Sequence, residues 1–107
     1  MGDKATILAF IAEFSGATDT FLRGCCYWFA QILSVRFGGE TVYEPIEGHF
    51  LQRIDGALYD VRGDMTEAYK AIPLIRWDGY EDVDPLHYQH IFRDCVLKAR
   101  CIDGIDA

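Results

Sequence analysis

The chain has 107 residues, half of them hydrophobic, and a formal net charge of −7. This length predicts a single folded domain over residues 1–107, with enough apolar side chains for a buried core. The negative charge argues against a nucleic-acid partner, because binding to a phosphate backbone depends on clustered lysine and arginine residues.

Two helices are predicted in the first third of the chain. Asp3 is typical of a helix N-cap, and apolar residues follow it at helical spacing. After a polar turn at residues 18–20, a second helix is predicted over residues 24–37, ended by two glycines. Its apolar residues lie almost all round, which indicates packing on more than one side. One stripe begins at Cys26, at the helix N-terminus, where backbone N–H groups favour a thiolate.

A short strand over residues 41–44 and a β-hairpin over residues 48–62 are predicted next. Residues 55–56 read Asp-Gly, a strong signal for a two-residue hairpin turn. The register that this turn sets puts His49 and Asp60 on one face of the hairpin as diagonal neighbours. The hairpin therefore brings an imidazole and a carboxylate together.

The rest of the chain predicts a short helix over residues 66–71, an acidic loop around Asp78, and a last helix. Asp84 supplies the N-cap of this last helix and Pro85 its first turn. The predicted order is helix, helix, three strands, helix. It indicates an α+β fold in which a small antiparallel sheet packs on the central N-terminal helix that carries the cysteine.

Cys26, His49 and Asp60 have the residue types and the order of a thiol nucleophile, its base, and the acid that orients the base. In this interpretation they form a catalytic triad that acts on a protein or peptide substrate, and no cofactor or metal is expected. A simpler interpretation of each residue stays open. Cys26 can be a buried small hydrophobe, His49 a strand histidine, and Asp60 a surface acid paired with Arg62 or Arg53.

Residues 24–30, Gly-Cys-Cys-Tyr-Trp-Phe-Ala, resemble the nucleophile segment of the papain-like and transglutaminase-like superfamily of cysteine hydrolases. The resemblance puts Cys26, rather than the cysteine before it, at the nucleophile position. The later order of His49 and Asp60 on neighbouring strands is similar to the transglutaminase-like arrangement. The resemblance covers roughly residues 20–64, and it implies a compact papain-like or transglutaminase-like core with amide hydrolase, deamidase or transferase activity.

Papain-like peptidases also place a glutamine shortly before the cysteine to complete the oxyanion hole, and residues 17–23 contain none. The sequence is also similar to small proteins of bacteriophages and Gram-positive prophages. Both observations support an alternative function, a catalytically inactive phage protein that binds a host protein. Its contacts would be the acidic face and exposed aromatic residues such as Trp77 and Tyr80.

The four cysteines have neither C-x-x-C nor zinc-ribbon spacing, so free thiols are expected, with Cys25 and Cys95 in the core. His87, His90 and Asp94 have a helical spacing that suits a metal, although solvent exposure on the polar side of the last helix explains the same positions. Apolar runs are too short for a bilayer span and no signal-peptide pattern opens the chain. We therefore expect no membrane partner and a cytoplasmic location.

Overall fold

The computed structural model describes residues 3–22 and 25–97 of the chain. Within these residues the protein has an α+β fold with a five-stranded antiparallel sheet, which confirms the predicted fold class. The helices are α1 (Lys4–Ala12), η1 (Ser15–Ala17), α2 (Thr18–Leu22), α3 (Cys26–Phe37), α4 (Thr66–Tyr69), α5 (Tyr80–Val83), α6 (Pro85–Ile91) and the π-helical η2 (Phe92–Leu97). The strands are β1 (Glu40–Glu44), β2 (His49–Ile54), β3 (Ala57–Asp60), β4 (Gly63–Asp64) and β5 (Ile75–Arg76), in the order β4-β3-β2-β1-β5.

The first helices begin as the sequence predicts and then depart from the prediction. The Asp3 carboxylate accepts a hydrogen bond from the backbone N–H three residues on, at 2.8 Å, so the predicted N-cap of α1 is confirmed. Residues 18–20, predicted as a turn, instead begin α2. Phe21 of this helix is buried against Phe14 and Phe29, with ring centroids 5.8 and 5.1 Å away. This packing stabilises a helix that the weak propensities of threonine and aspartate do not predict.

The central hairpin follows the predicted register. Asp55 and Gly56 both have positive φ, 51° and 84°, as a tight two-residue hairpin turn requires. Ile54 pairs with Ala57 across this turn. The second strand ends at Asp60, two residues earlier than predicted, because the chain turns there and β4 pairs back onto β3.

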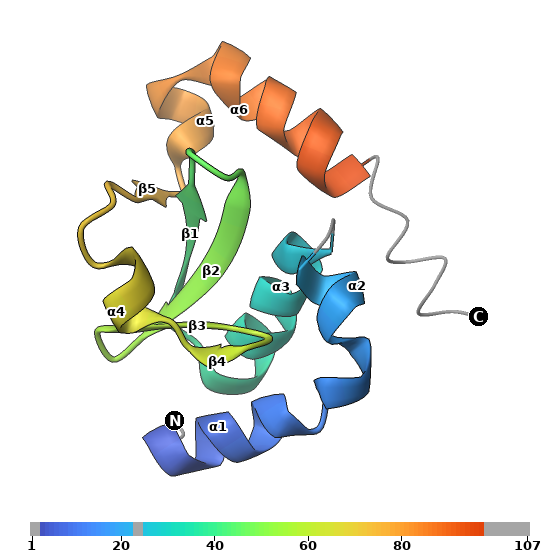
Figure 1. Cartoon of the computed structure of the whole chain (residues 1–107). Helices are drawn as coiled ribbons and strands as arrows, with labels where there is room; N and C mark the ends of the chain where they lie inside the picture. The colour runs from blue at the N-terminus through green and yellow to red at the C-terminus, as the bar shows by residue number, and fades with distance from the viewer. Residues whose placement is uncertain (1–2, 23–24, 98–107) are drawn as a thin grey trace.

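Helices cover both faces of the sheet (Figure 1). On one face, Phe29 and Leu33 of α3 share a buried cluster with Ile54 and Tyr59 of the hairpin. On the other face, Tyr69 of α4 packs with the buried residues Val42, Leu51 and Leu58. Figure 1 shows α5 and α6 beyond the end of β1 and β2, at the top of the view. The sheet thus lies between α3 and α4.

The segment predicted as an acidic loop contains two short elements, β5 and α5. β5 pairs with β1 in an antiparallel register, Tyr43 opposite Ile75. The last helix begins as predicted, with Pro85 in its first turn and the Asp84 side chain accepting a hydrogen bond from the backbone N–H of His87 at 3.2 Å.

None of the helices in the described ranges is by itself long and apolar enough to cross a membrane. The pair Lys4–Ala12 and Ser15–Leu22, bent by 59°, satisfies the length and composition test only when taken together. The cytoplasmic location stays a prediction.

Candidate active site

The predicted nucleophile lies at the start of α3. Cys26 is the first residue of the helix and is buried in a cluster with Ala30, Tyr43 and Phe50. The backbone N–H of Phe50, on β2, donates a hydrogen bond to its Sγ at 3.4 Å. The first N–H groups of a helix have no intrahelical acceptor and carry the positive end of the helix dipole. The sulfur therefore lies where backbone dipoles favour negative charge.

The predicted base and acid are in direct contact. His49 is the first residue of β2 and Asp60 the last of β3, and His49 Nε2 lies 2.8 Å from Asp60 Oδ2. Both side chains are buried, with 6% and 3% of their residues' surface exposed. The Cys26 side chain lies near enough to the imidazole to contribute to the raised pKa of His49. Because Asp60 occupies Nε2, Nδ1 is the ring nitrogen that is left for another partner.

The electrostatics of the pair favour charge on both partners. Burial by itself lowers the pKa of His49, yet hydrogen bonds and charge interactions with Asp60 and Cys26 outweigh it and raise this pKa to about 9. Burial raises the pKa of Asp60, but hydrogen bonds from His49 and Arg62 lower it below its usual value. At neutral pH the site therefore contains an imidazolium and a carboxylate.

Arg62 is a second partner of the Asp60 carboxylate. Its Nε and one terminal nitrogen donate to Asp60 Oδ2 at 3.1 and 2.6 Å, and its backbone N–H donates to Oδ1 at 2.7 Å. The alternative that pairs Asp60 with Arg62 is thus correct in its partner, but Asp60 is a buried acid and not a surface one. Arg53, the other candidate partner, instead bonds to Glu40.

Tyr69 also contacts the triad, and the sequence did not indicate it. The ring of Tyr69, on α4, stacks beside the His49 imidazole, with centroids 6.1 Å apart and planes inclined by 26°. Its hydroxyl accepts a hydrogen bond from Arg62 at 3.0 Å and donates one to Glu47 at 3.2 Å. Tyr69 comes from another element, and no sequence periodicity connects it with the hairpin.

Glu44 is a buried carboxylate directly across the sheet from His49. Its oxygens accept hydrogen bonds from the backbone N–H groups of Ile46 and Glu47, in the turn that joins β1 to β2. This interaction accounts for its burial, because a turn side chain that satisfies backbone donors stabilises the loop. The carboxylate therefore supports the loop from which His49 begins.

Several expectations about other residues need correction. Cys25 is disulfide-bonded, so the expectation of free thiols is wrong for it, since sequence spacing shows local pairs only. Cys26 and Cys95 are the free thiols among the described cysteines. Trp77, expected as an exposed contact, is buried in the same cluster as Cys26 because β5 attaches it to the edge of the sheet.

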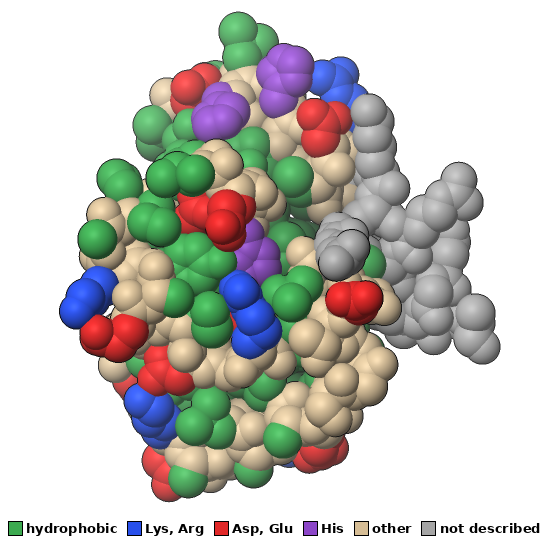
Figure 2. All heavy atoms as spheres, in the orientation of Figure 1, with side chains coloured by type: hydrophobic (Ala, Val, Ile, Leu, Met, Phe, Trp, Pro, Cys, Tyr) green, Lys and Arg blue, Asp and Glu red, His purple; other side chains and the backbone are tan. Residues whose placement is uncertain are grey.

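The alternative metal site on the last helix does not form. Nδ1 of His87 is hydrogen-bonded to the Tyr80 hydroxyl at 2.7 Å, and Nδ1 of His90 faces Arg93 at 3.2 Å. Over residues 3–22 and 25–97, no three His, Cys, Asp or Glu side chains are placed to hold a metal ion. Figure 2 shows histidine side chains over α6, at the top of the molecule, and another in the middle of the same face, beside acidic and basic groups.

Among residues 17–23, the polar side chains that could replace the missing oxyanion glutamine are those of Thr18, Asp19, Thr20 and Arg23. The Thr18 hydroxyl donates to the backbone carbonyl of Ser15 at 3.0 Å, within its own helical turn. Arg23 lies outside the described residues. The backbone N–H groups at the start of α3 have no intrahelical acceptor and are available as donors to an oxyanion.

One comparison with known proteins identifies a relationship. A family model described as phage YunG-like protein matches residues 11–94, which include α2 to α6, the sheet and all three predicted site residues. No curated protein and no solved structure matches the chain. The resemblance to small phage proteins is confirmed by this match.

Proposed function

Since the chain belongs to the phage YunG-like protein family, whose description names no chemistry, we propose its function from the site: a cysteine-dependent acyl-transfer enzyme with Cys26, His49 and Asp60 as its triad. The observation that supports the proposal is the buried His49–Asp60 pair at 2.8 Å, with the Cys26 side chain near enough to help raise the pKa of the imidazole. A surface histidine or a core cysteine needs no such arrangement.

The proposal includes a papain-like or transglutaminase-like core over residues 20–64. Its support is the order of the parts: a cysteine at the first turn of α3, then His49 and Asp60 on neighbouring antiparallel strands. The compact loops leave little room for the substrate-binding subdomains of larger enzymes. The proposed substrate is therefore an exposed amide or ester group on a protein or peptide.

In the proposed reaction the Cys26 thiolate attacks the substrate carbonyl carbon, and a C–S bond forms as the carbonyl oxygen becomes an oxyanion. Backbone N–H groups at the start of α3 stabilise this oxyanion. The His49 imidazolium then donates its proton to the leaving nitrogen or oxygen, and the bond to the leaving group breaks. Asp60 stabilises the imidazolium throughout and does not take its proton. Water as second substrate gives hydrolysis or deamidation, and an amine gives transfer.

The test compares the rate at which iodoacetamide alkylates Cys26 in Asp60→Asn and in Asp64→Asn. Asp64 is the matched control, because it is a nearby acid whose partners are Lys4 and Thr66 and not His49. An imidazolium beside a thiol stabilises the reactive thiolate, so loss of the Asp60 charge should slow alkylation about tenfold near pH 6. Fragment mass spectrometry assigns the modified cysteine, with Cys26→Ser as the blank.

A slower reaction in Asp60→Asn alone supports the triad, and an acyl adduct at Cys26 after treatment with an activated ester would identify the nucleophile. Equal rates in the parent and in both folded variants would exclude a working triad. The binding function would then take first place.

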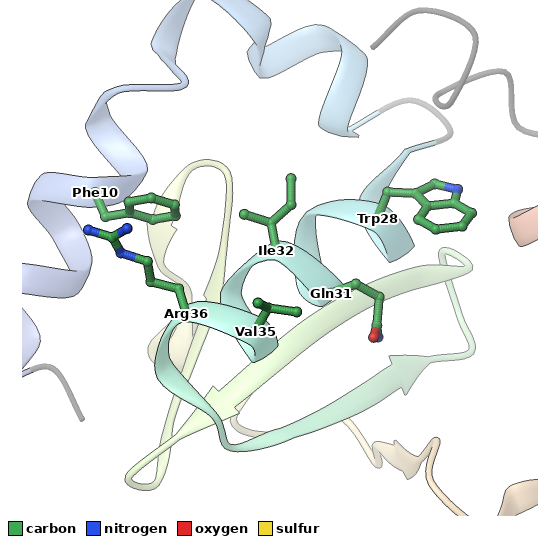
Figure 3. A pocket seen from close by; sticks show the side chains of 6 residues that line it. All are labelled: Phe10, Trp28, Gln31, Ile32, Val35 and Arg36. Atoms are coloured by element: carbon green, nitrogen blue, oxygen red, sulfur yellow. The ribbon is translucent and has the colours of Figure 1, made fainter. Parts of the chain in front are cut away.

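A second candidate function, binding to a host protein, is favoured by one exposed apolar surface. A groove of about 740 Å³ runs along the side of α3 that faces away from the sheet (Figure 3). It is lined by Phe10, Trp28, Gln31, Ile32, Val35 and Arg36. Val35 is 89% exposed, although other apolar residues of the same helix are buried. This function would be supported if Cys26 is unreactive in the folded protein and the Val35→Glu variant loses binding to the host protein.

A further inference from the structure

We propose that Arg62 is a positioning residue of the candidate site. Its guanidinium holds the Asp60 carboxylate toward His49. Because the guanidinium also partly neutralises the negative charge of this carboxylate, it limits how firmly the imidazole keeps its proton. The inference rests on the proposed function, in which His49 must release a proton to the leaving group. It concerns the group that regulates that release.

The hydrogen bonds fix the orientation of the carboxylate. Arg62 approaches Asp60 through two side-chain nitrogens and its own backbone N–H, so both carboxylate oxygens are engaged. A planar guanidinium that binds through two nitrogens defines the plane of its carboxylate more closely than a single donor does. With this plane fixed, Oδ2 faces His49 Nε2.

The guanidinium is itself held in place, although its side chain is 37% exposed. The Tyr69 hydroxyl accepts one of its hydrogen bonds at 3.0 Å, and the guanidinium carbon lies 6.0 Å from the Tyr69 ring centroid. The Glu47 carboxylate in turn accepts a hydrogen bond from the Tyr69 hydroxyl. The same tyrosine ring stacks beside the His49 imidazole. The Tyr69 side chain thus contacts both the His49 imidazole and the Arg62 guanidinium.

The charges around His49 explain the second part of the proposal. Asp60 contacts the imidazole from β3, and the Tyr69 ring stacks beside it from α4. Glu44 pairs with His49 from the neighbouring strand β1, and Glu47 lies in the turn between these two strands. Cys26 is the neighbour from α3. Glu44 is engaged by backbone donors, which leaves Asp60 as the acid in direct contact with the ring. A cation bonded to the same Asp60 oxygen opposes the attraction between that oxygen and the imidazolium. Arg62 therefore weakens the hold of the site on the proton while it orients the acid.

The experiment is an NMR titration of the His49 ring in the parent chain, Arg62→Gln and Arg62→Lys, with His49→Gln used to assign its signal. In Arg62→Gln we expect the midpoint of His49 to rise by roughly 0.5–1 pH unit, because the Asp60 charge is no longer shared. In Arg62→Lys the charge remains and the midpoint should stay close to that of the parent. Arg53→Gln is the matched control, since Arg53 lies in the same hairpin but pairs with Glu40, and its midpoint should not move.

An unchanged or lower midpoint in Arg62→Gln would overturn the proposal, because it would mean that the charge of Arg62 does not reduce the proton affinity of the imidazole. If Arg62→Gln does not fold, Tyr69→Phe replaces it: loss of the hydroxyl that anchors Arg62 should shift the midpoint upward by a smaller amount, and no upward shift would overturn the proposal. The result is separable from the proposed function. A raised midpoint with equal alkylation rates in Asp60→Asn and the parent would refute catalysis and leave the role of Arg62 intact.

Discussion

At the scale of single residues, the unusual property of this protein is a charged pair in its interior. Burying a charged group is unfavourable unless hydrogen bonds and opposite charges offset the lost hydration. His49 and Asp60 satisfy that requirement through each other, through Cys26 and through Arg62. The pair therefore makes folding depend on pH.

The direction of that dependence follows from the raised pKa of His49. Its pKa is about 9 in the folded chain and near 6.5 when the ring is unperturbed. Between these values the folded state binds more protons than the unfolded state, so the free energy of unfolding falls as pH rises. The stabilisation is fully present below pH 6.5 and is lost as pH passes through about 9. We expect a loss on the order of 1–3 kcal/mol over this interval.

Urea denaturation of the parent and of His49→Gln at several pH values between 6 and 10 measures this loss. The difference in unfolding free energy between the two proteins isolates His49 from tyrosines and thiols that titrate in the same range. It should shrink with rising pH. A difference that stays constant over the interval would contradict the assignment of a raised pKa to His49.

The contact between His49 and Asp60 could be predicted from the sequence because it is local in the chain. His49 and Asp60 belong to one hairpin, and its Asp-Gly turn fixes their register, so a segment of twelve residues contains the information. Tyr69 reaches the imidazole from a helix beyond β4, and a contact between elements leaves no periodic signal. The disulfide of Cys25 was missed for the same reason.

At the scale of elements, the junction between α3 and β1 determines how the helix is placed on the sheet. Two glycines form this junction, and both have positive φ, 79° at Gly38 and 86° at Gly39. A side chain at Gly39 would place its Cβ 2.1 Å from the backbone oxygen of Arg53, on β2. At Gly38 nothing lies within 4 Å of such a Cβ. The backbone approaches closely at one glycine and not at the other.

We therefore expect Gly39→Ala to destabilise the protein more than Gly38→Ala. Both substitutions introduce strain of about 1–3 kcal/mol, because a side chain disfavours positive φ. Gly39→Ala adds a clash with backbone that cannot move without breaking the β1–β2 pairing. Chemical denaturation of the two variants compares them directly. Equal losses would mean that β2 is free to move away from the junction.

The elements that the sequence did not predict, among them β5 and α2, are short. β5 consists of two residues, and its pairing with β1 defines it more than its own composition does. α2 was predicted as a turn because Thr18, Asp19 and Thr20 are weak helix formers. Its stability comes from Phe21, whose partners Phe14 and Phe29 belong to other parts of the chain. Long amphipathic segments such as α3 were predictable because their pattern is contained within them.

At the scale of the whole molecule, α3 is the element on which the rest is assembled. Its apolar residues contact the N-terminal helices on one side and the sheet on another, as the all-round pattern predicts. Hydrogen bonds of a buried glutamine add to this packing. Gln52 of β2 donates to the Gly38 carbonyl at the end of α3 at 2.8 Å and accepts from the Thr41 hydroxyl at 2.7 Å. The orientation of Cys26 relative to His49 therefore depends on contacts along the whole helix.

Phe29 tests how much the packing of α3 contributes to the stability of the protein. It is 1% exposed, three residues after Cys26, and its ring lies 5.1 Å from both Phe14 and Phe21, so it joins three segments of the chain. Phe29→Ala should lower the free energy of unfolding by about 3–5 kcal/mol, because it removes a fully buried ring and leaves a cavity. The total free energy of unfolding of a domain of this size is about 5–15 kcal/mol, so this loss is a large part of it.

Val35→Ala on the same helix is the control, since Val35 is 89% exposed and should change stability by about 0.5 kcal/mol or less. If Phe29→Ala does not fold, Phe29→Leu keeps most of the volume and should still cost more than Val35→Ala. Equal urea midpoints for the Phe29 and Val35 variants would mean that the N-terminal helices do not pack on α3.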